Sequence, residues 1–339
     1  MNNEKSLSEK AASNIKSIVK DVFEHSDKQN AIIVYDTNSL ISKLLYSAYK
    51  EVLPDAIFID FNATLAEDIL EKLQALKEGD FVALIQSTNF RLNAFRIRVE
   101  LFKRQIKVIE HPHLSRMGES ELPAYVDSLF YDKEYYRKTG RALKAKIDAA
   151  SSGVIESDGE LLYCDSSFES AKLNIGDYSE MPNSGGQFPI GEVFTEAKDL
   201  ESLRGRVKIF IFSDTSYQIN RPKTSATLII EKGQVVATEN ISPEFDEILN
   251  LIREGEGSIW VRELGFGLNP AFTKTRTVSD TGTYERMCGV HLSLGRKHGM
   301  YGKPGFKRGD GKFHVDVFVD TTSVKFDDEV VFENERWVV

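Results

Sequence analysis

The sequence predicts an α/β fold, in which an N-terminal domain built on a doubly wound parallel sheet is followed by a mixed α+β domain. Apolar runs with the length of strands alternate with helical segments over residues 31–110, as is typical of a parallel sheet covered by helices on both faces. Beyond Ser151-Ser152-Gly153 the pattern changes to short strand-like runs and turns. A chain of 339 residues is also long for one core. We therefore expect two domains, residues 1–150 and 151–339.

Hydrophobic periodicity places the individual elements. Residues 5–24 carry apolar side chains at helical spacing, and Thr37-Asn38-Ser39 supplies a turn and an N-cap for a helix that runs to about Val52. The other elements expected in the first domain are strands at 31–36, 56–61, 80–87 and 106–110, and helices at 64–77, 93–104 and 121–150. In the second domain we expect strands at 153–165, 207–215, 225–231 and 234–239, and a helix at 244–253.

Two polar segments follow strands of the first domain, where parallel sheets often bind nucleotides. They are Asp36-Thr37-Asn38-Ser39 and Gln86-Ser87-Thr88-Asn89, and neither contains the glycines of a dinucleotide or phosphate-binding loop. We therefore predict no nucleotide cofactor there. His111-Pro112-His113 resembles a metal-binding pair, but the intervening proline and the loop context favour a surface turn.

Composition narrows the classes of partner and the compartment. The net charge of −9 argues against a general nucleic-acid or membrane-surface partner. Cys164 and Cys288 show no Cys-x-x-Cys spacing, so neither a disulfide framework nor a thiolate zinc site is indicated. Residues 1–20 are polar, and no run approaches the roughly 20 apolar residues of a membrane span. A cytoplasmic location is expected.

Histidine and carboxylate side chains near strand ends form a candidate metal site in the second domain. Period-two alternation in the run from 313 to 320 puts His314 and Asp316 on one strand face, and His291 likewise shares a face with Ser293. Glu263 ends an apolar run before a predicted Gly-x-Gly-x-Asn-Pro turn. Imidazole and carboxylate together suit zinc, manganese, cobalt or ferrous iron.

A fifth candidate metal ligand, Glu192, follows a glycine-rich segment and begins another apolar run. The segments that carry the pattern are Gly191-Glu192-Val193-Phe194-Thr195, Glu263 with its Gly-x-Gly-x-Asn-Pro, His291-Leu292-Ser293-Leu294-Gly295 and His314-Val315-Asp316. Their order resembles that of the thermophilic aminopeptidase T family of metallopeptidases, over about residues 150–320. The resemblance implies that two divalent ions are held by Glu192, Glu263, His291, His314 and Asp316.

The same resemblance implies a function. We expect a metalloprotease of the aminopeptidase type, a hydrolase that uses zinc, cobalt or manganese to release N-terminal residues from small peptides, and that forms a homodimer. Glu192 or Glu263 is the expected bridging ligand or proton acceptor. His298 stands where the family has a catalytic tyrosine, and Tyr301, three residues further on, is the candidate to take that role.

Other interpretations remain open. A related branch of the fold, 2,5-dihydroxypyridine 5,6-dioxygenase, holds one ferrous ion with two histidines and an aspartate, and Glu263 stands where that enzyme has its first histidine. The glutamate favours the hydrolase. A non-catalytic member of the family is a third possibility. Glu196 and Asp320 are read as supporting or surface carboxylates. The basic, glycine-rich loop 296–312 is either a mobile solvated loop or a lid that receives a substrate carboxylate.

Overall fold

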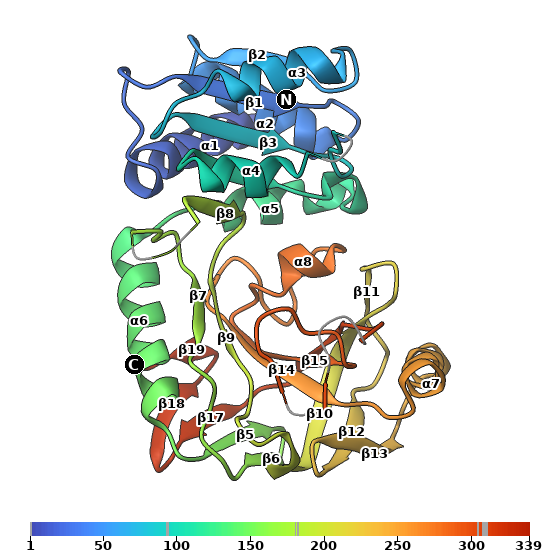
Figure 1. Cartoon of the computed structure of the whole chain (residues 1–339). Coiled ribbons are helices and arrows are strands. Elements are labelled where there is room, and N and C mark those ends of the chain that lie inside the picture. The colour runs from blue at the N-terminus through green and yellow to red at the C-terminus, as the bar shows by residue number, and fades with distance from the viewer. Residues whose placement is uncertain (1, 93–94, 180, 182, 304, 307–310) are drawn as a thin grey trace. The chain divides into compact units, whose positions relative to one another are not determined.

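The computed structural model describes residues 2–92, 95–179, 181, 183–303, 305–306 and 311–339 (Figure 1). It confirms the predicted fold class, because a parallel α/β sheet is followed by a large, curled antiparallel sheet. The chain divides into two compact units, each assembled from separate stretches. The first unit comprises Met1–Arg137, Gly176–Ile190 and Thr277–Thr283, and the second comprises Lys138–Ile175, Gly191–Arg276 and Tyr284–Val339.

The first unit is built on a five-stranded parallel sheet in the order β2-β1-β3-β4-β8. Its strands are β1 (Ala31–Tyr35), β2 (Ile57–Asp60), β3 (Phe81–Ile85), β4 (Lys107–His111) and β8 (Gly185–Gln187). The glycine-rich segment that precedes Glu192 thus contributes the strand β8 to this sheet. A side chain at Gly185 would overlap the backbone of Val108, so only glycine allows this pairing.

Helices cover both faces of the parallel sheet. Side chains alternate along each strand, so Ile32 and Val34 pack with α3 and α4 in one core cluster, whereas α1 and α2 pack together against the other face (Figure 1). The helices of the first unit are α1 (Asn2–Ser17) with its π-helical extension η1 (Ile18–Val22), α2 (Leu40–Val52), α3 (Ala66–Gln74), α4 (Ile97–Lys103) and α5 (Leu122–Ser128), with 3-10 turns η2 (Leu114–Arg116) and η3 (Glu119–Glu121). Helix α6 (Lys133–Ala149) begins in the first unit and lies mostly in the second.

Local capping explains two helix boundaries. Ser39 is the N-cap of α2, as predicted, because its hydroxyl accepts the N–H of Ser42. The segment 121–150 is largely helical, as expected, but it forms two helices, α5 and α6, and not one. Asp132 accepts the N–H of Tyr135 with its carboxylate, which starts α6 as a new helix. Part of the helix expected at 93–104, residues 93 and 94, lies outside the described residues.

His111 is fully buried at the end of β4, so the predicted surface turn is wrong for this residue. Its Nε2 lies 2.9 Å from the Tyr49 hydroxyl, and its Nδ1 lies 3.0 Å from the Tyr125 hydroxyl. The strand continues through residue 111 and turns this side chain inward, where the two hydroxyls satisfy both ring nitrogens. Burial lowers the pKa of His111 to about 3.

This buried imidazole predicts an acid-sensitive first unit. In the unfolded chain His111 binds a proton near pH 6.5, but the folded ring stays neutral down to about pH 3. Stability should therefore fall as the pH drops through this window, by up to about 1.4 kcal/mol per pH unit. Urea midpoints measured between pH 4 and pH 8 should show this slope in the wild type and a shallower one in His111→Gln. Equal slopes in the two proteins would contradict the assignment.

The second unit is built on an antiparallel sheet that extends in the order β19-β18-β17-β5-β6-β10-β16-β15-β14-β9-β7. These strands are β5 (Gly153–Ser157), β6 (Glu160–Cys164), β7 (Lys172–Asn174), β9 (Glu192–Thr195), β10 (Leu203–Ser213), β14 (Val261–Gly267), β15 (Gly289–Leu294), β16 (Val315–Val319), β17 (Ser323–Phe326), β18 (Glu329–Glu333) and β19 (Arg336–Trp337). Strands β11 (Ile219–Asn220), β12 (Ala226–Glu231) and β13 (Gln234–Glu239) branch from β10.

Short helical elements accompany this sheet. Helix α7 (Pro243–Glu256) begins at the N-cap Ser242 and ends at Gly257, whose left-handed conformation is typical of a helix C-terminus. Phe245 of this helix stacks on Phe212 of β10, with 4.4 Å between the ring centroids. The other elements are η4 (Leu200–Ser202) and α8 (Thr281–Tyr284). Among the described residues, no helix is long and apolar enough to cross a membrane.

Candidate metal centre

Four neighbouring strands of the second unit, β9, β14, β15 and β16, carry four of the five predicted ligands, and His314 directly precedes β16. The register sets Gly267 opposite Glu192, Gly265 opposite His291, Glu263 opposite Ser293, and Ser293 opposite Asp316. Directly paired residues project from the same face of an antiparallel sheet, as do residues two apart on one strand. The candidate ligands on these strands therefore gather on one face.

Glu192, Glu263 and His291 form the centre of this arrangement. One ligand atom from each lies within 4.8 Å of the other two, and all three residues are buried. His291 Nε2 lies 3.5 Å from Glu192 Oε1 and 3.6 Å from Glu263 Oε1. Such a group can hold a metal ion.

His314 and Asp316 lie beside this group. Ser293 Oγ donates to Asp316 Oδ1 at 2.6 Å and lies 3.4 Å from Glu263 Oε1, so it links the two carboxylates. His314 precedes β16, and its Nε2 lies 3.4 Å from Asp316 Oδ1. Its Nδ1 lies 3.0 Å from the carbonyl oxygen of Lys297, an arrangement that orients metal-binding histidines in many proteins.

The donor set fits a divalent cation. His291 Nε2 is buried and has no hydrogen-bond partner among the described residues. Burial alone would lower the pKa of His291, but the carboxylates of Glu263, Asp316 and Glu192 outweigh it and raise the pKa to about 9. A cation that binds here would therefore displace a proton from this imidazole.

The two glutamates of the group differ in their protonation behaviour. Burial raises the pKa of Glu192. Burial alone would also raise that of Glu263, but the imidazoles of His291 and His298 outweigh it and hold the pKa below its ordinary value. Glu263 is consequently the more firmly ionised of the two and the better candidate for a permanent anionic ligand.

Arg286 is a part of the site that the sequence analysis did not single out. Its side chain is buried, its Nη1 lies 2.9 Å from Glu192 Oε2, and it also pairs with Glu285. Burial raises the pKa of Glu285 to about 8 and also raises the pKa of Glu192, and the guanidinium opposes both shifts by favouring the charged carboxylates. The surrounding sequence, Tyr-Glu-Arg-Met, has no periodicity that would have indicated this role.

The two candidates for the place of the family tyrosine have different environments. His298 Nε2 lies 3.0 Å from Glu263 Oε2, and the His298 side chain is buried. Tyr301 packs against the His298 ring at 5.2 Å between centroids, but its hydroxyl donates to the backbone carbonyl of Ser170 at 2.8 Å. His298 therefore contacts the ligand group directly, and Tyr301 supports it.

Gly265 and Gly267 lie inside β14, so the turn predicted at these glycines is wrong. A Cβ atom at Gly265 would overlap the imidazole of His291, and one at Gly267 would overlap the backbone of Met287. Glycine in the interior of a strand often marks such a close approach. Gly265 therefore provides the space into which the His291 ring packs, and Gly267 allows the backbone of Met287 to approach.

Replacing Gly265 by alanine should displace the His291 ring. We expect the affinity for a divalent ion to fall by more than about tenfold. The overpacking should also destabilise the protein by about 1–3 kcal/mol. Zinc titration and urea denaturation measure the two effects. In the control Gly118→Ala, the nearest atom to the new Cβ is 3.9 Å away, so neither quantity should change. Unaltered zinc affinity in Gly265→Ala would argue against His291 as a ligand.

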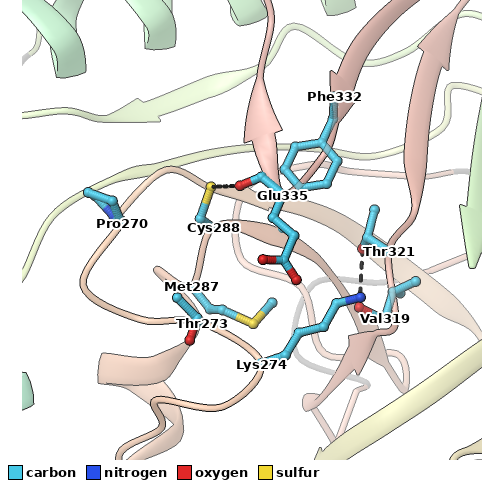
Figure 2. A pocket seen from close by; sticks show the side chains of 10 residues that line it. Pro270, Thr273, Lys274, Met287, Cys288, Val319, Thr321, Phe332 and Glu335 are labelled. Carbon is cyan, nitrogen blue, oxygen red and sulfur yellow. Dashed lines mark hydrogen bonds between the residues drawn. The ribbon is translucent and has the colours of Figure 1, made fainter.

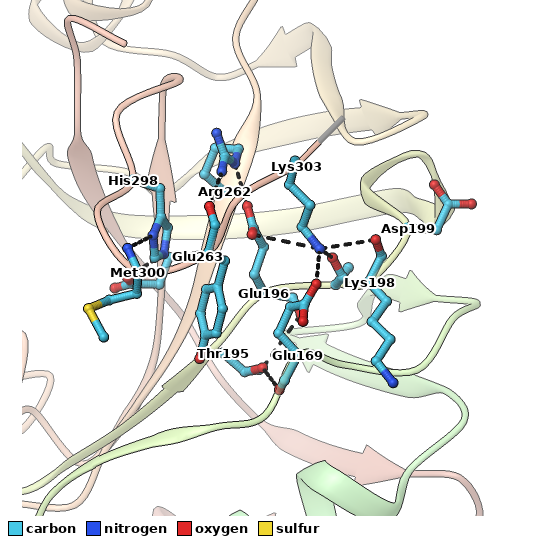
Figure 3. A network of polar contacts seen from close by, with 12 residues as sticks. Glu169, Thr195, Glu196, Lys198, Asp199, Arg262, Glu263, His298, Met300 and Lys303 are labelled. Carbon is cyan, nitrogen blue, oxygen red and sulfur yellow. Dashed lines mark hydrogen bonds and ion pairs between the residues drawn. The ribbon is translucent and has the colours of Figure 1, made fainter. Parts of the chain in front are cut away.

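A buried ion network lies next to the group (Figure 3). Glu196 pairs with Arg262, and Lys303 Nζ lies 2.6 Å from Glu169 Oε1 and 3.8 Å from Glu196 Oε2. Lys303 also donates to the carbonyl oxygen of Ala197 at 2.7 Å. These contacts hold the glycine-rich loop 296–312 at Lys303, near its middle. The basic residues Lys307 and Arg308, which were part of the lid interpretation, lie outside the described residues.

Two further features of the second unit contribute no ligand. Asp320 pairs with Lys274 at 2.5 Å in a partly exposed position. A cavity of about 90 Å³ is lined by Lys274, Cys288 and Glu335, among others (Figure 2). Burial raises the pKa of the Cys288 thiol to about 12, so it is protonated at neutral pH and a poor nucleophile.

The fold of the chain is shared with two proteins of known structure. The chain matches 2,5-dihydroxypyridine dioxygenase from Pseudomonas putida KT2440 with a TM-score of 0.64 and 14% identity, over 97% of each chain. It matches wild-type AmpT from Thermus thermophilus with a TM-score of 0.59 and 13% identity, over 98% of this chain and 99% of that one. The predicted resemblance is thereby confirmed at the level of the fold. No family model and no curated protein sequence matches the chain.

Proposed function

We propose that the protein is a metal-dependent hydrolase of the aminopeptidase type, which releases N-terminal residues from small peptides. The observation that carries this proposal is the buried group of Glu192, Glu263 and His291, with Asp316 and His314 beside it. Three carboxylates and two imidazoles form a donor set rich enough for two divalent ions. The proposed metals are zinc, cobalt or manganese.

When bound by these five residues, such ions would lower the pKa of a water molecule and polarise a peptide carbonyl. Side chains of the protein itself would accept and transfer the protons. Burial raises the pKa of Glu192, so its carboxylate is the better proton acceptor of the two glutamates. Glu263 is held ionised and serves as a ligand, and its Oε2 lies 3.0 Å from His298 Nε2. Arg286 balances the charge of Glu192, and Ser293 orients the carboxylates of Glu263 and Asp316.

A second candidate is a ferrous ring-cleaving dioxygenase. The match to the Pseudomonas dioxygenase, with the higher TM-score of the two, supports it. The position of Glu263 at the centre of the group opposes it, because a carboxylate replaces a histidine of the ferrous set that the resemblance implies. The hydrolase is therefore the function that this donor set supports better. A homodimer is proposed from the resemblance alone.

The two functions are separated by metal-dependent activity. Metal-free protein is loaded with zinc, cobalt or manganese and tested for release of leucine from leucine p-nitroanilide and from dipeptides. A parallel sample is loaded with ferrous iron without oxygen and tested for oxygen uptake with 2,5-dihydroxypyridine. We expect peptide release, and its loss in Glu192→Gln. Oxygen uptake without peptide release would favour the dioxygenase, and a metal-bound protein inactive in both assays would contradict both functions.

A further inference from the structure

A pocket of about 400 Å³ adjoins the candidate metal group. Its lining includes Arg262, Arg296, Lys297, His298, Tyr301 and Phe306. His298 connects the pocket to the group, because its Nε2 lies 3.0 Å from Glu263 Oε2. The volume is that of a binding site for a small molecule or for part of one.

A β-bulge shapes the wall between the pocket and the group. Val261 lies opposite Leu294, whereas Glu263 lies opposite Ser293, so Arg262 is the extra residue on β14. Bulges re-aim side chains and are common beside active sites. Arg262 therefore lines the pocket while its neighbour Glu263 belongs to the metal group (Figure 3).

The pocket is positively charged. None of the described residues that line it is a carboxylate. Arg262 is balanced by the buried Glu196, but neither Arg296 nor Lys297 has an ion-pair partner among the described residues. Arg296 Nε is buried and makes no hydrogen bond within that set. The pocket thus presents two cationic side chains whose charges the described residues leave uncompensated.

The nearby carboxylate of Glu256 does not neutralise them. Its Oε2 accepts the backbone N–H of Arg296 at 2.7 Å, and its Oε1 accepts those of Lys312 and Phe313 at 2.6 and 2.9 Å. Glu256 therefore holds the backbone of the pocket wall. The guanidinium of Arg296 makes one long hydrogen bond, 3.4 Å, to Ser258 Oγ.

An aromatic ring fixes the guanidinium groups. The Cζ atoms of Arg262 and Arg296 lie 4.5 and 5.8 Å from the centroid of Phe306, within the range of cation–π contacts. An arginine held in this way is pre-organised to form two parallel hydrogen bonds with one carboxylate. A flexible surface lysine would lack this geometry.

We propose that this pocket binds a carboxylate of the substrate through Arg296 and Lys297. The inference rests on the proposed function and sharpens it. The substrates are di- and tripeptides, whose free C-terminal carboxylate enters the pocket while the N-terminal peptide bond lies at the metal group. A long polypeptide would bring no charge to the pocket at this distance from its N-terminus.

The test compares leucylglycine with leucylglycinamide, which differ in the negative charge at the C-terminal end. Calorimetric binding is measured with the metal-free wild-type protein, so a preference is detectable without turnover. We expect leucylglycine to bind about 10- to 100-fold more tightly, as is usual for hydrogen bonds to a charged group. With zinc, the ratio of kcat/KM for the two peptides should change in the same direction.

Three variants test whether the pocket causes the preference for leucylglycine over leucylglycinamide. Arg296→Gln should reduce the ratio of the two affinities to less than about threefold. Lys297→Gln, at an exposed side chain that carries little risk for folding, should reduce it partially. Arg204→Gln removes an exposed arginine outside the pocket lining and should leave it unchanged.

The outcomes separate this inference from the proposed function. Equal binding of the two peptides overturns the inference, even if both are hydrolysed. A preference that persists in both Arg296→Gln and Lys297→Gln overturns it as well. Preferential binding of leucylglycine that depends on Arg296, with no hydrolysis under any metal, supports the carboxylate pocket and contradicts the peptidase.

Discussion

Replacing Glu263 by glutamine should lower the affinity for divalent ions by more than about 100-fold, because loss of a ligand exceeds the 10- to 100-fold effect usual for its outer partners. Glu263 contacts each part of the site, with its oxygens 3.6 Å from His291 Nε2, 3.0 Å from His298 Nε2 and 3.4 Å from Ser293 Oγ. The amide keeps the size of the side chain but removes its charge. Zinc titration against a competing chelator measures the change.

Asp320→Asn is the matched control for this prediction. Asp320 is a carboxylate on the adjoining chain segment, but it is partly exposed and pairs with Lys274. We expect its variant to bind zinc as the wild type does. If Glu263→Gln and Asp320→Asn have the same zinc affinity, Glu263 is not a ligand and the site must be rebuilt from the remaining residues.

Replacing Arg286 by methionine should destabilise the metal-free protein by about 3–5 kcal/mol. The guanidinium is buried between Glu192 and Glu285, so its removal takes away the closest cation of the buried Glu192 carboxylate and leaves only the His291 imidazole, 3.5 Å away. Methionine retains much of the packing volume and therefore isolates the loss of charge. Urea denaturation at neutral pH measures the free energy of unfolding.

Arg206→Met provides the comparison at the surface. Arg206 also bridges two carboxylates, Glu160 and Glu239, but in a solvated position. Exposed ion pairs contribute little to stability, so this variant should change the free energy of unfolding far less. Equal effects of the two substitutions would show that Glu192 does not depend on Arg286 for its charge balance.

The sequence predicted the parts of the site that depend on local periodicity. Alternation along single strands placed His291 and Ser293 on one face, and the register of β15 with β14 and β16 confirms it. The start of an apolar run located Glu192 at the first residue of β9. The strand expected from residue 313 begins two residues later, at Val315, yet His314 Nε2 still lies 3.4 Å from Asp316 Oδ1.

The contacts that sequence could not predict are between distant segments. Arg286 meets Glu192 across 94 positions of the chain, and no local pattern encodes such a pairing. Gly265 looked like a turn residue because glycine is common in turns, but here it makes room for a ring from the next strand. His111 appeared to be in a surface turn because a proline follows it, but it ends β4, where Tyr49 and Tyr125 bury it.

The most direct test of this account is the metal content of the wild-type protein, purified without oxygen and without chelators. We expect one or two divalent ions per chain of the wild type. The variant Glu263→Gln should keep its fold and lose these ions. Zinc, cobalt or manganese would support the hydrolase, and a single ferrous ion would support the dioxygenase. A wild-type protein that binds none of these ions, even after incubation with each in excess, would contradict the assignment of Glu192, Glu263 and His291 as a metal centre.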